Sequence, residues 1–346
     1  VTEANCGKGV FSNVVKATDT EDRHQALVAI KIMRCNDMMR KAAEKEVEVL
    51  RRIGHADKGG KTHCIRLIRT FEYRKHLCLV FECMWDNLRV ALKKYTQGKG
   101  MGLRTVRSYT KQLLTALNHI HRCQYVHADI KPDNILISDV KEGRNVVKIC
   151  DLGSAVELTE VEATAYLASR WYRSPEVTLG IKYGQACDTW ALGATLMELY
   201  NGKPLFPGRT NNDMIRLFMD VKGKLPHKLI TKGTLWKQHF NEQMDFKFID
   251  VDKVTQKQKI RVISDCSAKH PIQDIVIEKI GVEKQGSSAL ADQYLLKKAK
   301  QFANLIEQMT TLDPDKRPSA ADLLSHQFLA ESWEEPGAAK TGASRK

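Results

Sequence analysis

The hydrophobic pattern of this chain changes near residue 83, and this change restricts the possible folds more than any other feature. Before it, short apolar runs rich in β-branched residues predict strands, with one helix among them. After it, apolar residues recur every three or four positions, which predicts helices. The expected strands lie at 14–15, 28–30 and 77–81, and the expected helices at 41–52, 104–123, 186–200 and 294–309. We therefore expect an α+β protein with a small sheet-rich lobe, a large helical lobe and a cleft between them.

Charge and cysteine usage narrow the class of protein. The 346 residues carry a net charge of +14, which attracts anions such as ATP, acidic peptides or nucleic acid. Basic residues are spread along the chain and form no known nucleic-acid module, so a solvated basic surface is favoured over direct nucleic-acid binding. No apolar run approaches the roughly 20 residues of a membrane helix. The nine cysteines include no Cys-x-x-Cys pair, which disfavours disulfides and zinc and favours a reducing compartment.

One short polar loop, residues 127–134 (HADIKPDN), lies between apolar segments. Transfer of a phosphoryl group needs an acceptor for the hydroxyl proton, a cation near the moving group and a metal ligand. Asp129 can accept the proton, Lys131 can neutralise the phosphoryl charge and Asn134 can hold magnesium. A plain surface loop is the alternative, but so dense a polar cluster between apolar segments is costly unless it is used.

Six further motifs lie along the chain. They are GKGVFSNV at 7–14, VAIK at 28–31, DLG at 151–153, SPE at 174–176, DTWALG at 188–193 and DPDKRP at 313–318. Each is weak alone, because two glycines or an Asp-Leu-Gly most often mark a simple turn. Together with the polar loop, and in this order, they resemble the motifs of eukaryotic protein kinases from residue 7 to about 329. The stretch 54–62 has one residue too many for a P-loop and follows a helix, which disfavours the P-loop NTPases.

The resemblance implies where ATP and magnesium bind. Lys31 grips the α- and β-phosphates and is held by a helix glutamate, for which Glu46 fits and Glu44 and Glu48 are alternatives. The remaining implied contacts are Asp151 on magnesium, Gly7, Lys8 and Gly9 in the glycine loop, Val14 and Ala29 at the adenine, Phe81 as the gate to the back of the pocket, Glu82 and Met84 at the hinge, and Leu136 on the floor.

Other residues match structural positions of the kinases. The lysine of the polar loop is typical of serine/threonine kinases, and Ser169 matches the hydroxyl residue that contacts the catalytic aspartate and lysine in them. Glu176 and Arg317 match a buried ion pair of the kinases. Asp188 matches the start of the helix that follows the Ser-Pro-Glu motif in them. We expect these last three residues to stabilise the fold.

Two regions narrow the resemblance further. Residues 166–176 and the long stretch of about 203–294 resemble the CMGC group, which holds cyclin-dependent, MAP and dual-specificity tyrosine-regulated kinases. The run 202–226, together with Ala128 where most kinases have arginine, is similar to the spliceosomal pre-mRNA-processing kinases. That family phosphorylates proteins of the small nuclear ribonucleoprotein complexes and usually carries a Ser/Arg-rich extension before the kinase domain.

The alanine at position 128 affects how such a chain is switched on. The arginine usually found there receives a phosphate on the activation-segment threonine. Without it, a phosphate on Thr164 has a poorer partner, whereas Tyr166 has Arg170 and Arg173 close in sequence. We therefore predict that Tyr166 carries the activating phosphate, and an unmodified packing tyrosine is the alternative.

The resemblance implies a nuclear, monomeric protein serine/threonine kinase that uses ATP and magnesium and phosphorylates spliceosomal proteins. A dual-specificity tyrosine-regulated or MAP-like kinase with other substrates, or a pseudokinase scaffold, is the alternative. The kinase domain is expected at 1–330, with an N-lobe at 1–82, a C-lobe at 83–330 and a flexible tail at 331–346. The glycine turn begins at Gly7, which leaves little room for a preceding strand and suggests a fragment of a longer protein.

Overall fold

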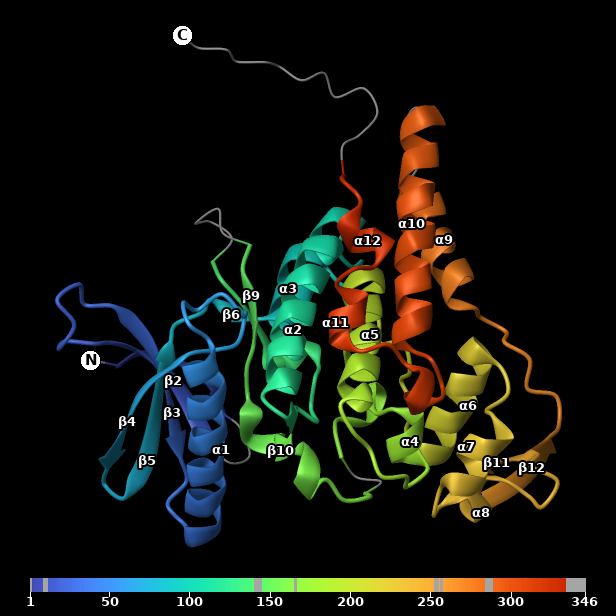
Figure 1. Cartoon of the computed structure of the whole chain (residues 1–346), viewed down its shortest axis with the longest axis horizontal. Helices are drawn as coiled ribbons and strands as arrows, with labels where there is room; N and C mark the ends of the chain where they lie inside the picture. Colours follow the sequence, from blue (N-terminus) through green and yellow to red (C-terminus); the bar gives the residue numbers. More distant parts are fainter. Residues whose placement is uncertain are drawn as a thin grey trace.

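The structure is a computed structural model that describes residues 2–8, 12–139, 145–164, 167–251, 255, 258–283 and 289–333. Figure 1 shows an antiparallel sheet with one long helix, followed by a larger helical part. This arrangement confirms the predicted α+β, two-lobed fold class. None of the helices in these ranges has the length and apolar composition needed to span a membrane.

The N-terminal sheet has five antiparallel strands in the order β1-β2-β3-β5-β4. They are β1 (Thr2–Lys8), β2 (Ser12–Thr18), β3 (Leu27–Met33), β4 (Leu67–Tyr73) and β5 (His76–Glu82). β1 includes Gly7 and starts five residues before it, so a strand does form in the little room that the sequence leaves there. β3 pairs with β5 so that Lys31 lies opposite Leu79, in the central part of the sheet.

Helix α1 (Asp37–Ala56) packs against this sheet and is longer at both ends than the predicted 41–52. It begins at Asn36, whose side chain accepts a hydrogen bond from the Met39 amide at 2.8 Å. One face of the helix is apolar and buried. Its buried apolar residues are Ala43, Val47, Val49, Leu50 and Ile53. Because this face is fixed against the sheet, the rotation of the helix about its axis is fixed as well.

The helical part is built around α5 (Ala186–Asn201), nearly all of whose residues are buried. Helices α3 (Leu103–Arg122) and α10 (Ala289–Met309) pack against α5, and Figure 1 shows the three running side by side. Trp190 of α5 contacts Phe206 and Phe218 with ring centroids 5.4 and 5.1 Å apart. The other helices are α2 (Leu88–Thr96), α4 (Pro175–Thr178), α6 (Asn211–Lys222), α7 (His227–Lys232), α8 (Trp236–His239), α9 (Ile272–Glu283), α11 (Ala320–Leu323) and α12 (Gln327–Ala330).

The polar motifs are placed by short strands that follow the N-terminal sheet in the chain. A three-stranded sheet contains β6 (Asp86–Asn87), β8 (Ile135–Ile137) and β9 (Val147–Ile149), and β7 (Tyr125–Val126) pairs with β10 (Val156–Glu157). The loop 127–134 therefore follows β7 and leads into β8, and the Asp-Leu-Gly motif follows β9. The long stretch after residue 203 contains α6 to α9 and a hairpin of β11 (Phe246–Val251) and the largely exposed β12 (Gln258–Ile263), which the sequence pattern did not predict.

Candidate active site

Lys31 of β3 is held by two carboxylates. Its Nζ donates to both oxygens of Glu46, at 2.7 and 2.8 Å, and to Oδ1 of Asp151 at 3.1 Å. Burial opposes the charge on Lys31, but Glu46 and Asp151 raise its pKa above the ordinary value. The two alternatives are placed elsewhere, because Glu44 is exposed and accepts from Arg40, while Glu48 is exposed. Of the three glutamates, only Glu46 points its carboxylate at Lys31.

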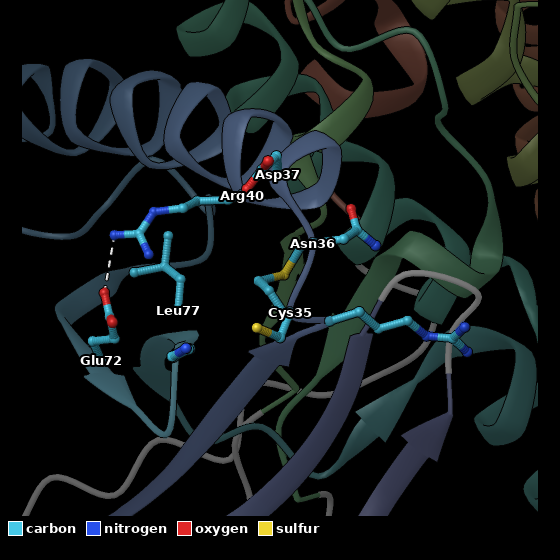
Figure 2. A pocket seen from close by; sticks show the side chains of 9 residues that line it. Cys35, Asn36, Asp37, Arg40, Glu72 and Leu77 are labelled. Atoms are coloured by element: carbon cyan, nitrogen blue, oxygen red, sulfur yellow. Dashed lines mark hydrogen bonds and ion pairs between the residues drawn. The ribbon is translucent and has the colours of Figure 1, made fainter.

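A surface ion pair links the start of α1 to the sheet. Arg40 NH2 contacts Glu72 Oε2 of β4 at 2.9 Å, as the dashed line in Figure 2 shows. The two residues border a shallow cavity of about 370 Å³ beside Cys35 and Leu77. Arg40 lies six residues before Glu46 on the same helix.

Asp129 lies at the centre of the polar loop and accepts hydrogen bonds from three residues. Oδ2 accepts from Lys131 Nζ at 2.7 Å and from Asn134 Nδ2 at 3.0 Å. Oδ1 accepts from the amide and the hydroxyl of Ser169 at 3.0 and 3.1 Å. Lys131 also donates to Ser169 Oγ at 2.8 Å, so the predicted contact of Ser169 with both residues is present. The Asp129 side chain keeps 17% of its surface exposed, which leaves it accessible to a substrate hydroxyl.

The backbone before Asp129 is fixed by a buried carboxylate on α5. Asp188 accepts from the amides of His127 and Ala128, each at 2.8 Å, and contacts His121 Nε2 at 3.0 Å. Ala128 has φ of +68°, a conformation that an L-residue adopts only when its surroundings hold it there. The Asp188 contacts supply that support, so a residue on α5 sets the direction of the catalytic loop.

Asp151 and Asn134 are brought together by the backbone. Cys150, which precedes Asp151, donates its amide to the carbonyl of Asn134 at 2.9 Å. Burial disfavours the charge on Asp151, but the charge and hydrogen bond of Lys31 outweigh it, so the pKa of Asp151 lies below its usual value. Leu152 is 3% exposed and anchors the motif in the core.

The donor set of these two residues fits magnesium. Mg²⁺ prefers oxygen ligands and usually takes one or two carboxylates while phosphates and waters complete its shell. Asn134 uses its amide nitrogen on Asp129, which leaves the amide oxygen for a metal, and Asp151 has a second carboxylate oxygen beyond the one that Lys31 contacts. Within the described ranges, no group of three or more His, Cys, Asp or Glu side chains could hold a metal.

The predicted adenine contacts lie on β2, β3, β5 and β8 and in the segment that follows β5. Val14 of β2 pairs with Lys31, and Ala29 of β3 pairs with Phe81 of β5. Ala29 precedes Lys31 by two residues and therefore lies on the same face of the strand. Leu136 lies in the middle of β8. Val14, Ala29, Phe81, Met84 and Leu136 are all half-buried, as residues lining a cleft would be. Gly7 and Lys8 lie in β1 opposite Val14 and Asn13, and Gly9 falls outside the described residues.

The hinge contains a contact that the sequence did not suggest. Glu82 Oε1 accepts from Lys148 Nζ of β9 at 2.6 Å and from the Arg66 amide at 2.9 Å. The side chain of Glu82 is thus engaged with the protein, and its backbone amide also donates to the carbonyl of Arg66, at 3.2 Å. Lys148 and Glu82 are 66 positions apart in the sequence, and no local pattern links them.

The activation segment, from the Asp-Leu-Gly motif at 151–153 to the Ser-Pro-Glu motif at 174–176, is only partly described. Tyr166, the predicted phosphorylation site, lies outside the described residues. Arg173 donates to the carbonyls of Leu167 and Ala168 and to Asn211 Oδ1, at 2.8, 3.1 and 2.8 Å. Arg170 is exposed. Of the two predicted arginines, Arg173 holds the segment's backbone, and Arg170 is the more accessible to a phosphate.

Glu176 and Arg317 form a fully buried ion pair. The guanidinium donates to both carboxylate oxygens, at 2.8 and 3.0 Å, and the two side chains are 1% and 0% exposed. Arg317 also lies over the Trp190 ring, 5.2 Å from its centroid. The pair joins the end of the activation segment to the core of the helical part.

Comparison with known proteins defines the class of this molecule. The protein kinase domain model matches residues 1–329, and the chain therefore belongs to the protein kinase family. Among individual relatives, the serine/threonine-protein kinase prp4 of Schizosaccharomyces pombe is 40% identical over 95% of this chain. The serine/threonine-protein kinase prpf4B of Dictyostelium discoideum is 41% identical over 93%, and homeodomain-interacting protein kinase 2 of Mus musculus is 30% identical over 93%. These matches confirm the kinase resemblance inferred from the sequence.

The relatives are longer than the part that matches. The alignment covers 66% of the Schizosaccharomyces kinase, 38% of the Dictyostelium kinase and 27% of the mouse kinase. The chain thus spans less than two thirds of the length of each of these relatives. The similarity concerns the kinase domain that they share.

Proposed function

We propose that this chain transfers the γ-phosphate of ATP to serine or threonine side chains of proteins. The observation that carries the proposal is the arrangement around Asp129, whose carboxylate is oriented by Lys131, Asn134 and Ser169. These contacts fix the Asp129 carboxylate beside the Lys131 ammonium group. A base that accepts a hydroxyl proton next to a phosphoryl group needs such an arrangement. Incubation with ATP, magnesium and a mixture of peptides, followed by phosphoamino-acid analysis, should give phosphoserine and phosphothreonine. Phosphotyrosine alone, or no transfer, would contradict the proposal.

The residues divide the work of the reaction. Lys31 orients the α- and β-phosphates, and Glu46 keeps the lysine in place. Asp129 accepts the proton of the substrate hydroxyl as its oxygen attacks the γ-phosphorus and the bond to the β-phosphate oxygen breaks. Lys131 offsets the charge on the transferred group. Asn134 and Asp151 would hold magnesium, which neutralises phosphate charge when bound.

A pseudokinase scaffold is the alternative from another functional class. Pseudokinases usually lack the lysine, the base or the metal aspartate. Here Lys31, Asp129, Asn134 and Asp151 are all present, and Lys31 contacts Asp151 while Asn134 contacts Asp129. This arrangement favours an active enzyme, and transfer by the unmodified chain distinguishes the two functions.

We further propose that the substrates are proteins of the spliceosome and that the enzyme acts in the nucleus. The support is the resemblance of residues 202–226 and Ala128 to the pre-mRNA-processing kinases, together with the prp4 and prpf4B relatives. Phosphorylation rates should be compared between isolated small nuclear ribonucleoprotein proteins and proline-directed peptides of the kind that MAP kinases prefer. Faster modification of the ribonucleoprotein proteins is expected. A preference for the MAP-type peptides would favour the other CMGC alternative.

We also propose that activation involves phosphate on Tyr166. Ala128 is 2% exposed and packs in an apolar cluster with Val161 and the half-buried Leu167, so position 128 offers no cation to a phosphate. Exposed Arg170 lies four residues after Tyr166 and could pair with a phosphate there. Mass spectrometry of the active enzyme should find phosphate on Tyr166. Phosphate on Thr164 with none on Tyr166 would contradict this proposal.

A further inference from the structure

Two carboxylates beside the catalytic loop share one arginine of this chain. Asp133 precedes Asn134 in the 3₁₀ helix Pro132–Asn134, and Glu198 lies on α5. Arg89 of α2 reaches both, through an ion pair with Glu198 and another with Asp133 at 3.1 Å. The Glu198 side chain is 1% exposed, whereas that of Asp133 is 44% exposed. The cluster therefore extends from the core to the surface of the loop.

The guanidinium uses all three of its nitrogens in this cluster. Nε and NH2 donate to Asp133, NH1 donates to Glu198, and NH2 also lies 2.6 Å from the Tyr172 hydroxyl. That hydroxyl donates to the second oxygen of Glu198 at 2.5 Å. Burial disfavours the charge on Arg89, but its bond to Asp133 and the charge of Glu198 raise its pKa above the ordinary value.

The cluster adjoins both segments that orient Asp129. Asn134, next to Asp133, donates to the Asp129 carboxylate. Ser169, which also contacts Asp129, leads directly into the 3₁₀ helix Arg170–Tyr172 that carries Tyr172. Both segments that orient Asp129 therefore continue into the Arg89 cluster. A peptide whose hydroxyl reaches Asp129 extends its neighbouring residues past this cluster.

Removal of the guanidinium would expose an unsatisfied acidic site. Glu198 would become a buried charge without a cation, and Asp133 would remain at the surface beside it. Such a pair binds a guanidinium strongly, because a planar donor group can contact both carboxylates at once. In the present structure, that position is filled by the chain's own side chain.

We propose that Arg89 is a specificity-determining residue, which occupies an acidic subsite and thereby prevents the enzyme from selecting substrates with arginine at one position near the phosphoacceptor. This proposal rests on the proposed kinase function and adds a substrate rule to it. The enzyme should accept a neutral residue at that position about as well as a basic one.

The test is an arginine scan of one phosphorylated peptide, in which each residue flanking the acceptor is replaced in turn by arginine or alanine. For the unmodified enzyme, kcat/KM of the arginine peptide and of the alanine peptide should differ by less than about fivefold at every position, as for exposed charge pairs. For Arg89→Ala, one position should favour arginine by more than about tenfold, since a charged hydrogen bond forms there. Lys93→Ala removes an exposed cation from the same helix and should leave the ratios unchanged.

Further variants address the stability of Arg89→Ala. If it does not fold, Arg89→Ala with Glu198→Gln removes the uncompensated buried charge and should keep a smaller preference for arginine through Asp133. Addition of Asp133→Asn should reduce the gained preference of Arg89→Ala and should abolish that of the variant that also carries Glu198→Gln. An unmodified enzyme that already selects arginine there, or an active Arg89 variant without any gain, would overturn the proposal. Absence of transfer by the unmodified enzyme would instead refute the proposed kinase function.

Discussion

The backbone amide of Ala128 donates a hydrogen bond to Oδ1 of Asp188, 2.8 Å away on the central helix α5. Asp188 is 1% exposed and also receives the amide of His127 and contacts His121. The catalytic loop is thus attached to the core one residue before Asp129. Ala128 takes part in this attachment through its backbone amide. The attachment therefore does not depend on the side chain at position 128, where the sequence resemblance leads us to expect arginine.

Replacement of Asp188 should destabilise the protein. Asp188→Ala leaves two buried amides without an acceptor, and each such group costs about 1–3 kcal/mol. Urea unfolding should show a loss of about 3 kcal/mol. Asp188→Asn keeps one acceptor oxygen and should lose less. Equal stability of the alanine variant and the unmodified chain would show that the loop does not depend on this carboxylate.

Replacement of Glu46 should impair transfer by releasing Lys31. Glu46→Gln keeps the size of the side chain but removes the charge that pairs with the lysine. We expect kcat/KM for ATP to fall by about 10- to 100-fold, as for the loss of a hydrogen bond between charged groups. Glu48→Gln, at an exposed position two residues further on the same helix, is the matched control and should have little effect. Equal losses in both variants would contradict the assignment.

The same pair should give the enzyme an acidic limb in its pH profile. Burial raises the pKa of Glu46 more than the nearby Lys31 lowers it, so this carboxyl takes up a proton at a higher pH than an ordinary glutamate. As the pH falls through this raised pKa, the ion pair is lost, while Asp151, with its lowered pKa, stays ionised to a lower pH. ATP affinity of the unmodified chain should therefore decline on this limb, and that of Glu46→Gln should stay flat over the same range. Parallel curves would argue against Glu46 as the titrating group.

The buried pair of Glu176 and Arg317 predicts a larger effect on stability. Arg317→Ala leaves the Glu176 carboxylate buried without a cation, which typically costs about 3–5 kcal/mol. Arg317→Lys retains the charge but not the bidentate contact. Its stability should lie between that of Arg317→Ala and that of the unmodified chain. Lys316→Ala, at the exposed neighbouring position, should change stability by less than about 0.5 kcal/mol. A small loss for Arg317→Ala would mean that solvent reaches Glu176.

The sequence predicted the elements whose patterns are local. The strand containing Lys31 and the helix containing Glu46 follow from apolar runs and helical spacing, and the fold class follows from their order. The β4 and β12 strands were missed because most of their residues are exposed, so no continuous apolar run marks either strand in the sequence. The choice among three glutamates on α1 stayed open because it depends on how the helix faces the sheet.

Long-range contacts of the site could not be predicted from one sequence. Lys148 meets Glu82, and Arg89 meets Glu198, across separations of 66 and 109 residues. No motif contains either pair, since each arises where separate elements pack together. Asp129 and Lys131 were identified because the chemistry of phosphoryl transfer places its charged groups within one loop.

The central claim is that Asp129 is the base of an active kinase, and the variant Asp129→Asn tests it most directly. Phosphate transfer and ATP binding should be measured side by side on the unmodified and variant chains. We expect transfer to fall by about 10²- to 10⁴-fold, the usual contribution of a positioned general base. ATP affinity should remain largely unchanged, because Lys31 and Glu46 are untouched. Transfer at an undiminished rate by Asp129→Asn would contradict the account.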